Sequence, residues 1–271
     1  MDNSTCFCGS GKLKDECHPD IHEKSRAARV LKLYNNIDNK IEAHYKINAG
    51  KYPCKKGCTE CCYTDFPISD IEMDLISYEV SKWNVNKTSM VMKKAARNFD
   101  FIVKKYPEYI KTLAADSNNS KDIILKSFTY NVDQKDFPCA FMDDKSKECM
   151  IYKVRPVVCR TYGTAFYNSN SPSENEVKYY EVCSKIGQRE KSYKFQADLN
   201  DLNGEIKSLS YINMVLYSKS LLVRSYPMFF HIYLNFLEHG SLTVANDFDL
   251  KFLEPEEKYI QHMYNRASMY K

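Results

Sequence analysis

The sequence predicts a mainly α-helical protein with a small β-hairpin or irregular cysteine-rich core and a compact knuckle at its N-terminus. Two observations predict this class. Apolar and aromatic residues recur at helical spacing over long stretches of the chain. The 11 cysteines fall into tight groups instead of being scattered. With 271 residues, 44% of them hydrophobic, the chain can bury a real core in one or two domains.

Residues 1–19 are expected to form the knuckle, which is too short to fold without a cross-link or a metal. Its Cys-x-Cys-x8-Cys-His pattern consists of Cys6, Cys8, Cys17 and His18. Three thiolates and one imidazole at this close spacing suit a closed tetrahedral zinc site, which leaves no position for a substrate water. We therefore expect Zn2+ here in a structural role or as part of a docking surface.

Residues 20–50 are expected to form a linking helix. Asp20-Ile-His-Glu23 has the form of a capping box, and apolar residues follow at helical spacing until Asn48-Ala-Gly50. The same capping signature recurs in Ser69-Asp-Ile-Glu72, which predicts the start of a second helix that runs to about Trp83.

Residues 51–191 are expected to form one cysteine-rich domain with a helical insertion. Thr88 to Ala115 predicts a helix that is broken at Pro107, and residues 123–132 predict a strand. Residues 137–152 have apolar arms around a polar centre. This pattern predicts a hairpin or tight loop that brings Cys139 towards Cys149. A polar turn is expected from Asn168 to Asn175.

Residues 192–271 form a C-terminal segment without cysteine. Periodic apolar and aromatic residues predict about three helices, the last two opened near Pro227 and Pro255. The aromatic stripe around Phe229 and Phe230 is expected to pack in the core rather than to bind a ligand.

Eight further cysteines predict a second metal-binding region. They are Cys54, Cys58, Cys61, Cys62, Cys139, Cys149, Cys159 and Cys183. On a helix the first three would share one face, while Cys62 would point about 100° away, so one mononuclear site does not easily use the whole cluster. Eight thiolates divide into two four-thiolate centres, and these can be two zincs, a zinc and an iron–sulfur cluster such as [4Fe-4S], or two clusters. The spacing does not choose between them.

The alternatives for these thiols are disulfides and inert buried side chains. The chain opens MDNSTCFC, without a basic leader or an apolar signal core, and its densest apolar stretch, Met228 to Leu237, is too short to span a bilayer. We therefore expect no membrane span and a reducing, cytoplasmic location. In that compartment closely spaced cysteines favour metal or redox chemistry over disulfides.

The charge of the chain gives little support for nucleic-acid binding. The formal net charge is +4. It becomes slightly negative once all the cysteines are thiolates that hold three dications, and the basic residues are scattered rather than gathered in a stripe. The expected partner is another protein. His231, His239 and His262 are isolated, and no phosphate-binding glycine loop occurs.

The segment Cys6-Phe-Cys8-Gly-Ser-Gly11-Lys-Leu-Lys-Asp-Glu-Cys17-His18 resembles the SEC-C zinc motif found at the tail of the bacterial translocation ATPase. The resemblance covers only this segment. It implies a zinc ion and a small protein-binding surface.

The eight-cysteine region resembles the YkgJ-like cysteine-cluster family, which is described as zinc- or iron-chelating and often catalogued with iron–sulfur proteins. The resemblance runs from Cys54-Lys-Lys-Gly-Cys58-Thr-Glu-Cys61-Cys62 through Phe137-Pro-Cys139 to Cys149-Met-Ile-Tyr152 and Arg155-Pro-Val-Val-Cys159-Arg160-Thr-Tyr162. The sequence departs from the family pattern at Ala140, where proline is common, and in its long helical insertion.

Arg155 and Arg160 flank Cys159 and are candidates for a supporting role at the metal. Guanidinium groups beside a thiolate can donate hydrogen bonds to sulfur and stabilise its negative charge. The alternative is ordinary packing of the loop.

Three functions are compatible with these patterns. The first is a cysteine-cluster protein that binds zinc, an iron–sulfur cluster or both and presents a protein-interaction surface. The second is an enzyme: the resemblance extends to the flagellin lysine N-methylases, which implies S-adenosylmethionine as cosubstrate, although the chain shows no glycine-rich loop for it. The third is a metal or redox sensor built on the adjacent pair Cys61 and Cys62. No catalytic residue is predicted.

Overall fold

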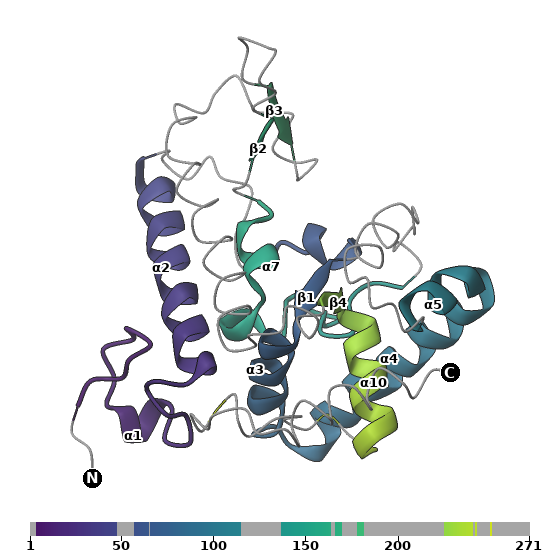
Figure 1. Cartoon of the computed structure of the whole chain (residues 1–271), viewed down its shortest axis with the longest axis horizontal. Helices are drawn as coiled ribbons and strands as arrows, with labels where there is room; N and C mark the ends of the chain where they lie inside the picture. The colour runs from purple at the N-terminus through teal and green to yellow at the C-terminus, as the bar shows by residue number, and fades with distance from the viewer. Residues whose placement is uncertain are drawn as a thin grey trace, which may run out of the picture.

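The computed structural model describes residues 4–47, 57–64, 66–114, 137–163, 166–169, 178–181, 225–240, 242 and 250. This part of the chain is mainly helical with two small antiparallel sheets, which confirms the predicted fold class (Figure 1). The helices are α1 (Lys14–Cys17), α2 (Arg26–Ile47), α3 (Asp70–Val80), α4 (Val85–Lys105), α5 (Pro107–Ala114), α7 (Val157–Thr161) and α10 (Met228–His239). Two 3-10 turns are η1 (Glu60–Tyr63) and η3 (Tyr152–Val154). The strands are β1 (Pro67–Ser69), β2 (Phe166–Ser169), β3 (Lys178–Glu181) and β4 (Ser225–Pro227).

Helix α2 begins at Arg26, so the capping box predicted at Asp20 is wrong. Ser25 caps the helix instead, because its Oγ accepts the Ala28 N–H at 3.1 Å. The residues before it are held by other contacts: Ile21 is completely buried, and the His22 N–H donates to the Leu250 carbonyl at 2.7 Å. Tertiary packing therefore outweighs the local capping signature.

Helix α3 starts where the sequence predicts. The Glu72 carboxylate accepts hydrogen bonds from both the N–H and the hydroxyl of Ser69, each at 3.1 Å. Nearly every residue of α3 is buried, which is typical of a helix enclosed on all sides. The helix stops at Val80, three residues short of the predicted end at Trp83.

Helices α4 and α5 lie between Cys62 and Cys139, where the sequence predicts a helical insertion. Asn84 caps α4 by accepting the Lys87 N–H at 3.0 Å, and α4 begins three residues before the predicted Thr88. The break lies at Pro107, as predicted, because proline has no N–H for a continuing helical bond. Helix α4 packs on α10, and the rings of Phe99 and Tyr233 stack between them.

Both sheets join segments whose pairing the sequence does not predict. Strand β1 pairs antiparallel with β4, with Ile68 opposite Tyr226, so this short ladder joins the segments that lead into α3 and α10 (Figure 1). His231 on α10 secures this contact, because its Nε2 lies 2.8 Å from the Ile68 carbonyl oxygen. Strand β2 pairs with β3. The predicted strand at 123–132 and the helix expected near Pro255 lie outside the described residues.

The buried side chains form three clusters. One joins Cys6 and Cys8 to the inner faces of α2 and α3 and to Val157 of α7. The second joins α3 and α4 to the loop over residues 139–154, and the third joins α4, α5 and α10. The knuckle thus shares its core with α2 and α3 instead of standing apart. Among the described helices, none is both long and apolar enough to cross a membrane.

Candidate metal centres

The knuckle is a short loop closed on itself. Thr5 forms an isolated antiparallel β-bridge with Leu13, and the Cys6 N–H donates to the Lys12 carbonyl at 2.8 Å. The chain turns through Gly9 and Gly11, both with positive φ. Helix α1 follows directly, with its last residue and the next one supplying the remaining two candidate ligands.

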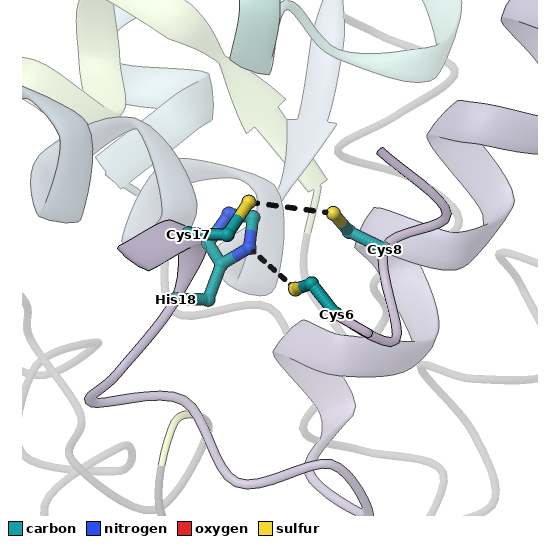
Figure 2. Close-up of side chains that lie close together, drawn as sticks. All are labelled: Cys6, Cys8, Cys17 and His18. Atoms are coloured by element: carbon teal, nitrogen blue, oxygen red, sulfur yellow. Dashed lines mark hydrogen bonds between the residues drawn. The ribbon is translucent and has the colours of Figure 1, made fainter. Parts of the chain in front are cut away.

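Four ligand atoms converge inside this loop (Figure 2). They belong to Cys6, Cys8, Cys17 and His18 and lie within 4.8 Å of one another. The Cys8 and Cys17 sulfurs are 3.6 Å apart, and the Cys6 sulfur is 3.3 Å from His18 Nδ1. Tetrahedral zinc with Zn–S of about 2.3 Å and Zn–N of about 2.0 Å places two sulfurs about 3.8 Å apart and sulfur and nitrogen about 3.5 Å apart. The side chains therefore fit this ion closely.

The environment of the knuckle favours two protonation states that metal binding requires. Burial, with the nearby charge of Lys82, lowers the pKa of His18 to about 4, so its imidazole is neutral at pH 7. Burial raises the pKa of Cys8, but hydrogen bonds from Ser10 and the neighbouring thiols outweigh it, and the net pKa is lowered. Burial raises the pKa of Cys6 to about 12, so this thiol is protonated at pH 7 until a metal replaces the proton.

The knuckle is fixed to the rest of the protein by both apolar and polar contacts. Phe7 packs against the buried cluster that contains α2 and α3, and within the knuckle it stacks on the His18 ring with centroids 5.7 Å apart. The Tyr78 hydroxyl at the end of α3 donates to Asp20 at 3.2 Å. Because Cys6 and Cys8 are buried in the same cluster as α2, the ligand geometry and the position of α2 depend on each other.

Gly9 is a point of close approach between the knuckle and α2. A Cβ built at Gly9 would lie 2.4 Å from the Asn35 side-chain nitrogen, whereas a Cβ at Gly11 meets nothing within 4 Å. Both glycines have φ near +75°, so alanine at either position bears a similar backbone strain of about 1–2 kcal/mol. We expect Gly9→Ala to lower the free energy of unfolding by more than Gly11→Ala does.

Urea denaturation of the two glycine variants measures this difference. Adding Asn35→Ala to Gly9→Ala is expected to return the loss to that of Gly11→Ala. Equal losses for the two single variants would show that the approach to Asn35 is relieved without strain.

The second candidate centre is a cavity that is partly open to solvent, here called the cysteine pocket. Six of the eight predicted cysteines line it: Cys58, Cys61, Cys62, Cys139, Cys149 and Cys159. The rest of the wall is largely apolar and aromatic, and α10 contributes Met228, Phe229 and Ile232. Cys54 and Cys183 lie outside the described residues.

Three separate segments bring these cysteines together. Cys61 and Cys62 lie on η1, and Cys58 precedes it, so the helical face considered for Cys58 and Cys61 does not exist. The Cys139 N–H donates to the Cys62 carbonyl at 2.8 Å. Met142 forms an isolated β-bridge with Cys149, and this pairing closes the predicted tight loop.

The thiols in the pocket influence one another strongly. Hydrogen bonds from Cys159 and Cys62 lower the pKa of Cys61 to about 3, with a further contribution from the charge of Arg155. Burial raises the pKa of Cys139 to about 12 and that of Cys149 to about 11. One thiolate is thus stabilised by its neighbours, whereas burial and the neighbouring thiols raise the pKa values of Cys62, Cys139, Cys149 and Cys159, so their thiolate forms need a cation to compensate the charge.

The pocket cysteines are more widely spread than the knuckle ligands. Among the described residues, it is the knuckle that brings three or more ligand atoms of cysteine, histidine or acidic side chains within 4.8 Å of one another. Cys61 has hydrogen-bonding thiols on two sides, but the described pocket cysteines form no such group and instead line a cavity. The thiols therefore surround a space instead of converging on one point.

Of the two arginines around Cys159, Arg155 lines the pocket, whereas the guanidinium of Arg160 is directed elsewhere. Arg160 Nε donates to the Arg155 carbonyl at 2.8 Å, and the other guanidinium nitrogens donate to Asp38 and to the Lys153 carbonyl. Arg155 lies over the Tyr152 ring. Both positive charges still act on the thiols. They favour the Cys149 thiolate and so reduce the rise in its pKa that burial causes.

Three further residues contact the segment that carries Cys159, although the sequence does not single them out: Asp38, Tyr34 and Glu72. Asp38 and Tyr34 look like ordinary residues of an amphipathic helix, and Glu72 looks like a capping residue alone. No pattern in a single sequence connects them with Cys159, because the contacts run between segments far apart in the chain.

A comparison with protein-family models supports metal binding. Residues 53–186 match the model of the CxxCxxCC family, whose description reads "Putative zinc- or iron-chelating domain". Comparisons with curated proteins and with solved structures gave no match. The segment from residue 53 to residue 186, which holds the cysteine pocket, is therefore similar to a zinc- or iron-chelating domain of the CxxCxxCC family.

Proposed function

We propose that the protein binds Zn2+ at the knuckle and a polynuclear thiolate-bound centre, such as [4Fe-4S], in the cysteine pocket. The zinc ligands are Cys6, Cys8, Cys17 and His18. The pocket ligands come from Cys54, Cys58, Cys61, Cys62, Cys139, Cys149, Cys159 and Cys183. Both centres stabilise the fold, and the metal-stabilised surface binds another protein.

The observation that carries this proposal is the contrast between the two sets of cysteines. A closed mononuclear zinc site needs all its ligand atoms around one point, and the knuckle has that arrangement. In a [4Fe-4S] cluster each of the four thiolates binds a different iron, so the sulfurs surround a larger body. The six described pocket cysteines line a cavity, which suits the second kind of centre.

Metal and sulfide analysis of protein purified without air tests both assignments. We expect one zinc per chain together with iron and acid-labile sulfide, and a broad charge-transfer absorption that bleaches on exposure to air. Three zincs and a colourless protein would contradict the polynuclear centre and leave two mononuclear sites in the pocket. Protein without metal would contradict the whole proposal.

The apolar wall of the pocket favours one alternative function, an enzyme that modifies a protein substrate at the metal-bearing pocket. Phe66, Phe137 and Phe229 line the cavity beside the cysteines, as is common in pockets for organic ligands. Equilibrium binding of S-adenosylmethionine to the metal-loaded protein tests the methylase version of this alternative. Absence of binding at millimolar concentration would exclude it.

A further inference from the structure

We propose that Asp38 on α2 is a positioning residue for the cysteine pocket and that it fixes Cys159 through the two flanking arginines. This inference rests on the proposed metal centre in the pocket. It assigns to the long helix α2 a role in metal binding at a site to which α2 contributes no ligand.

The Asp38 carboxylate bridges the two arginines. One of its oxygens accepts a hydrogen bond from Arg160, and the other lies 3.7 Å from Arg155 Nη2. The side chain of Arg160 is only 1% exposed and that of Arg155 only 12%, whereas Asp38 is 47% exposed. The aspartate therefore compensates, from the surface, two cationic side chains that are almost completely buried.

The arginines in turn fix the segment that carries Cys159. Arg160 is the next residue along α7, and its guanidinium also binds the carbonyls of Lys153 and Arg155. It therefore holds the turn before α7 against the helix itself. The same guanidinium lies 4.2 Å from the centre of the Tyr34 ring on α2. Asp38 and Tyr34, one turn apart, thus enclose a single buried cation.

A second contact holds the start of α7 to the same helices. Glu72 of α3 accepts the Val157 N–H at 2.8 Å and the Tyr34 hydroxyl at 3.3 Å. Helix α7 is consequently anchored before Cys159 by Glu72 and after it by Asp38, and in Figure 1 α3 and α7 both lie beside α2. A short helix of five residues has little rigidity of its own, so these anchors decide where Cys159 lies.

Two effects of removing Asp38 oppose each other. Loss of its negative charge leaves more positive potential near the thiols, which favours thiolates. However, it also leaves Arg160 buried without a carboxylate partner, and such a charge moves towards solvent or another partner at the expense of local structure. We expect the second effect to dominate, because all three contacts of the Arg160 guanidinium hold the segment around Cys159.

Residue-resolved thiol alkylation followed by mass spectrometry tests this proposal on the full, metal-loaded chain. In Asp38→Asn and Asp38→Ala we expect Cys149 and Cys159 to be alkylated about 10–100-fold faster than in the wild type, the range by which loss of supporting residues weakens metal sites. The knuckle cysteines are expected to stay protected. Asp38→Glu retains the charge and is expected to restore most of the protection.

Glu42→Gln is the matched control, since it removes a carboxylate one turn further along α2 whose ion pair with Lys46 is exposed. We expect it to behave as the wild type. Unchanged protection of Cys159 in Asp38→Asn, or slower alkylation, would overturn the positioning role. Equal loss of protection at the knuckle would also overturn it, because the effect would then be general unfolding. Unprotected pocket cysteines in the wild type would instead contradict the proposed metal centre.

Discussion

A Cys17→Ser variant is expected to lose the knuckle metal and, with it, much of the stability of the core that the knuckle shares with α2 and α3. The hydroxyl of serine is a poor zinc ligand, and the remaining Cys6, Cys8 and His18 cannot close a tetrahedron. Structural zinc sites in small domains supply binding free energies of about 10–16 kcal/mol, part of which stabilises the fold. We therefore expect the free energy of unfolding to fall by several kcal/mol.

Urea denaturation with parallel zinc analysis measures this loss. Ser10→Ala is the control: it removes the 3.3 Å contact between the Ser10 hydroxyl and the Cys17 sulfur but keeps all four ligands. Its effect is expected to stay within about 1 kcal/mol. Wild-type protein treated with a strong chelator should approach the stability of Cys17→Ser. A variant that loses zinc but unfolds at the wild-type urea concentration would show that the knuckle metal does not support the core.

A Glu72→Ala variant is expected to be destabilised by about 3–5 kcal/mol. The carboxylate accepts hydrogen bonds from Ser69, Val157 and Tyr34, and all of these lie in the buried region between α2, α3 and α7. Burial raises the pKa of Glu72, so its removal also relieves a desolvation cost. The donors left without an acceptor outweigh that relief, because each buried unsatisfied group costs about 1–3 kcal/mol.

Thermal and urea denaturation of Glu72→Ala beside Glu79→Ala isolates this effect. Glu79 lies on the same helix, but its carboxylate is 3.9 Å from Lys82 in a partly exposed ion pair. Such pairs contribute little, so Glu79→Ala is expected to stay within about 0.5 kcal/mol of the wild type. Comparable losses in the two variants would mean that the buried network around Glu72 adds nothing beyond helix propensity.

Local signals in the sequence predict much of the fold. The start of α3 at Ser69, the break at Pro107 and the start of α10 after Pro227 all depend on residues within one turn of the boundary. The knuckle is local too, because its ligands lie in a single short segment. Features of this kind can be found from one sequence.

The features that the sequence does not predict depend on distant contacts. The start of α2 was misplaced because the burial of Ile21 and the contact from His22 to Leu250 override a plausible capping box. The pairing of β1 with β4 involves three residues on each side, too few for an alternating pattern to be visible. The bridge from Asp38 to Arg160 likewise joins two charged residues that look independent in the sequence.

The pairing of β1 with β4 also has a consequence for the order of events during folding. Contacts between residues far apart in the chain require closure of a long loop and therefore form later than helices and tight turns. Helix α10 follows β4 directly and supplies one wall of the cysteine pocket. The thiols should thus stay accessible to incoming metal until that wall docks. Metal supplied during refolding is then expected to be incorporated faster than metal added to the folded, metal-free protein.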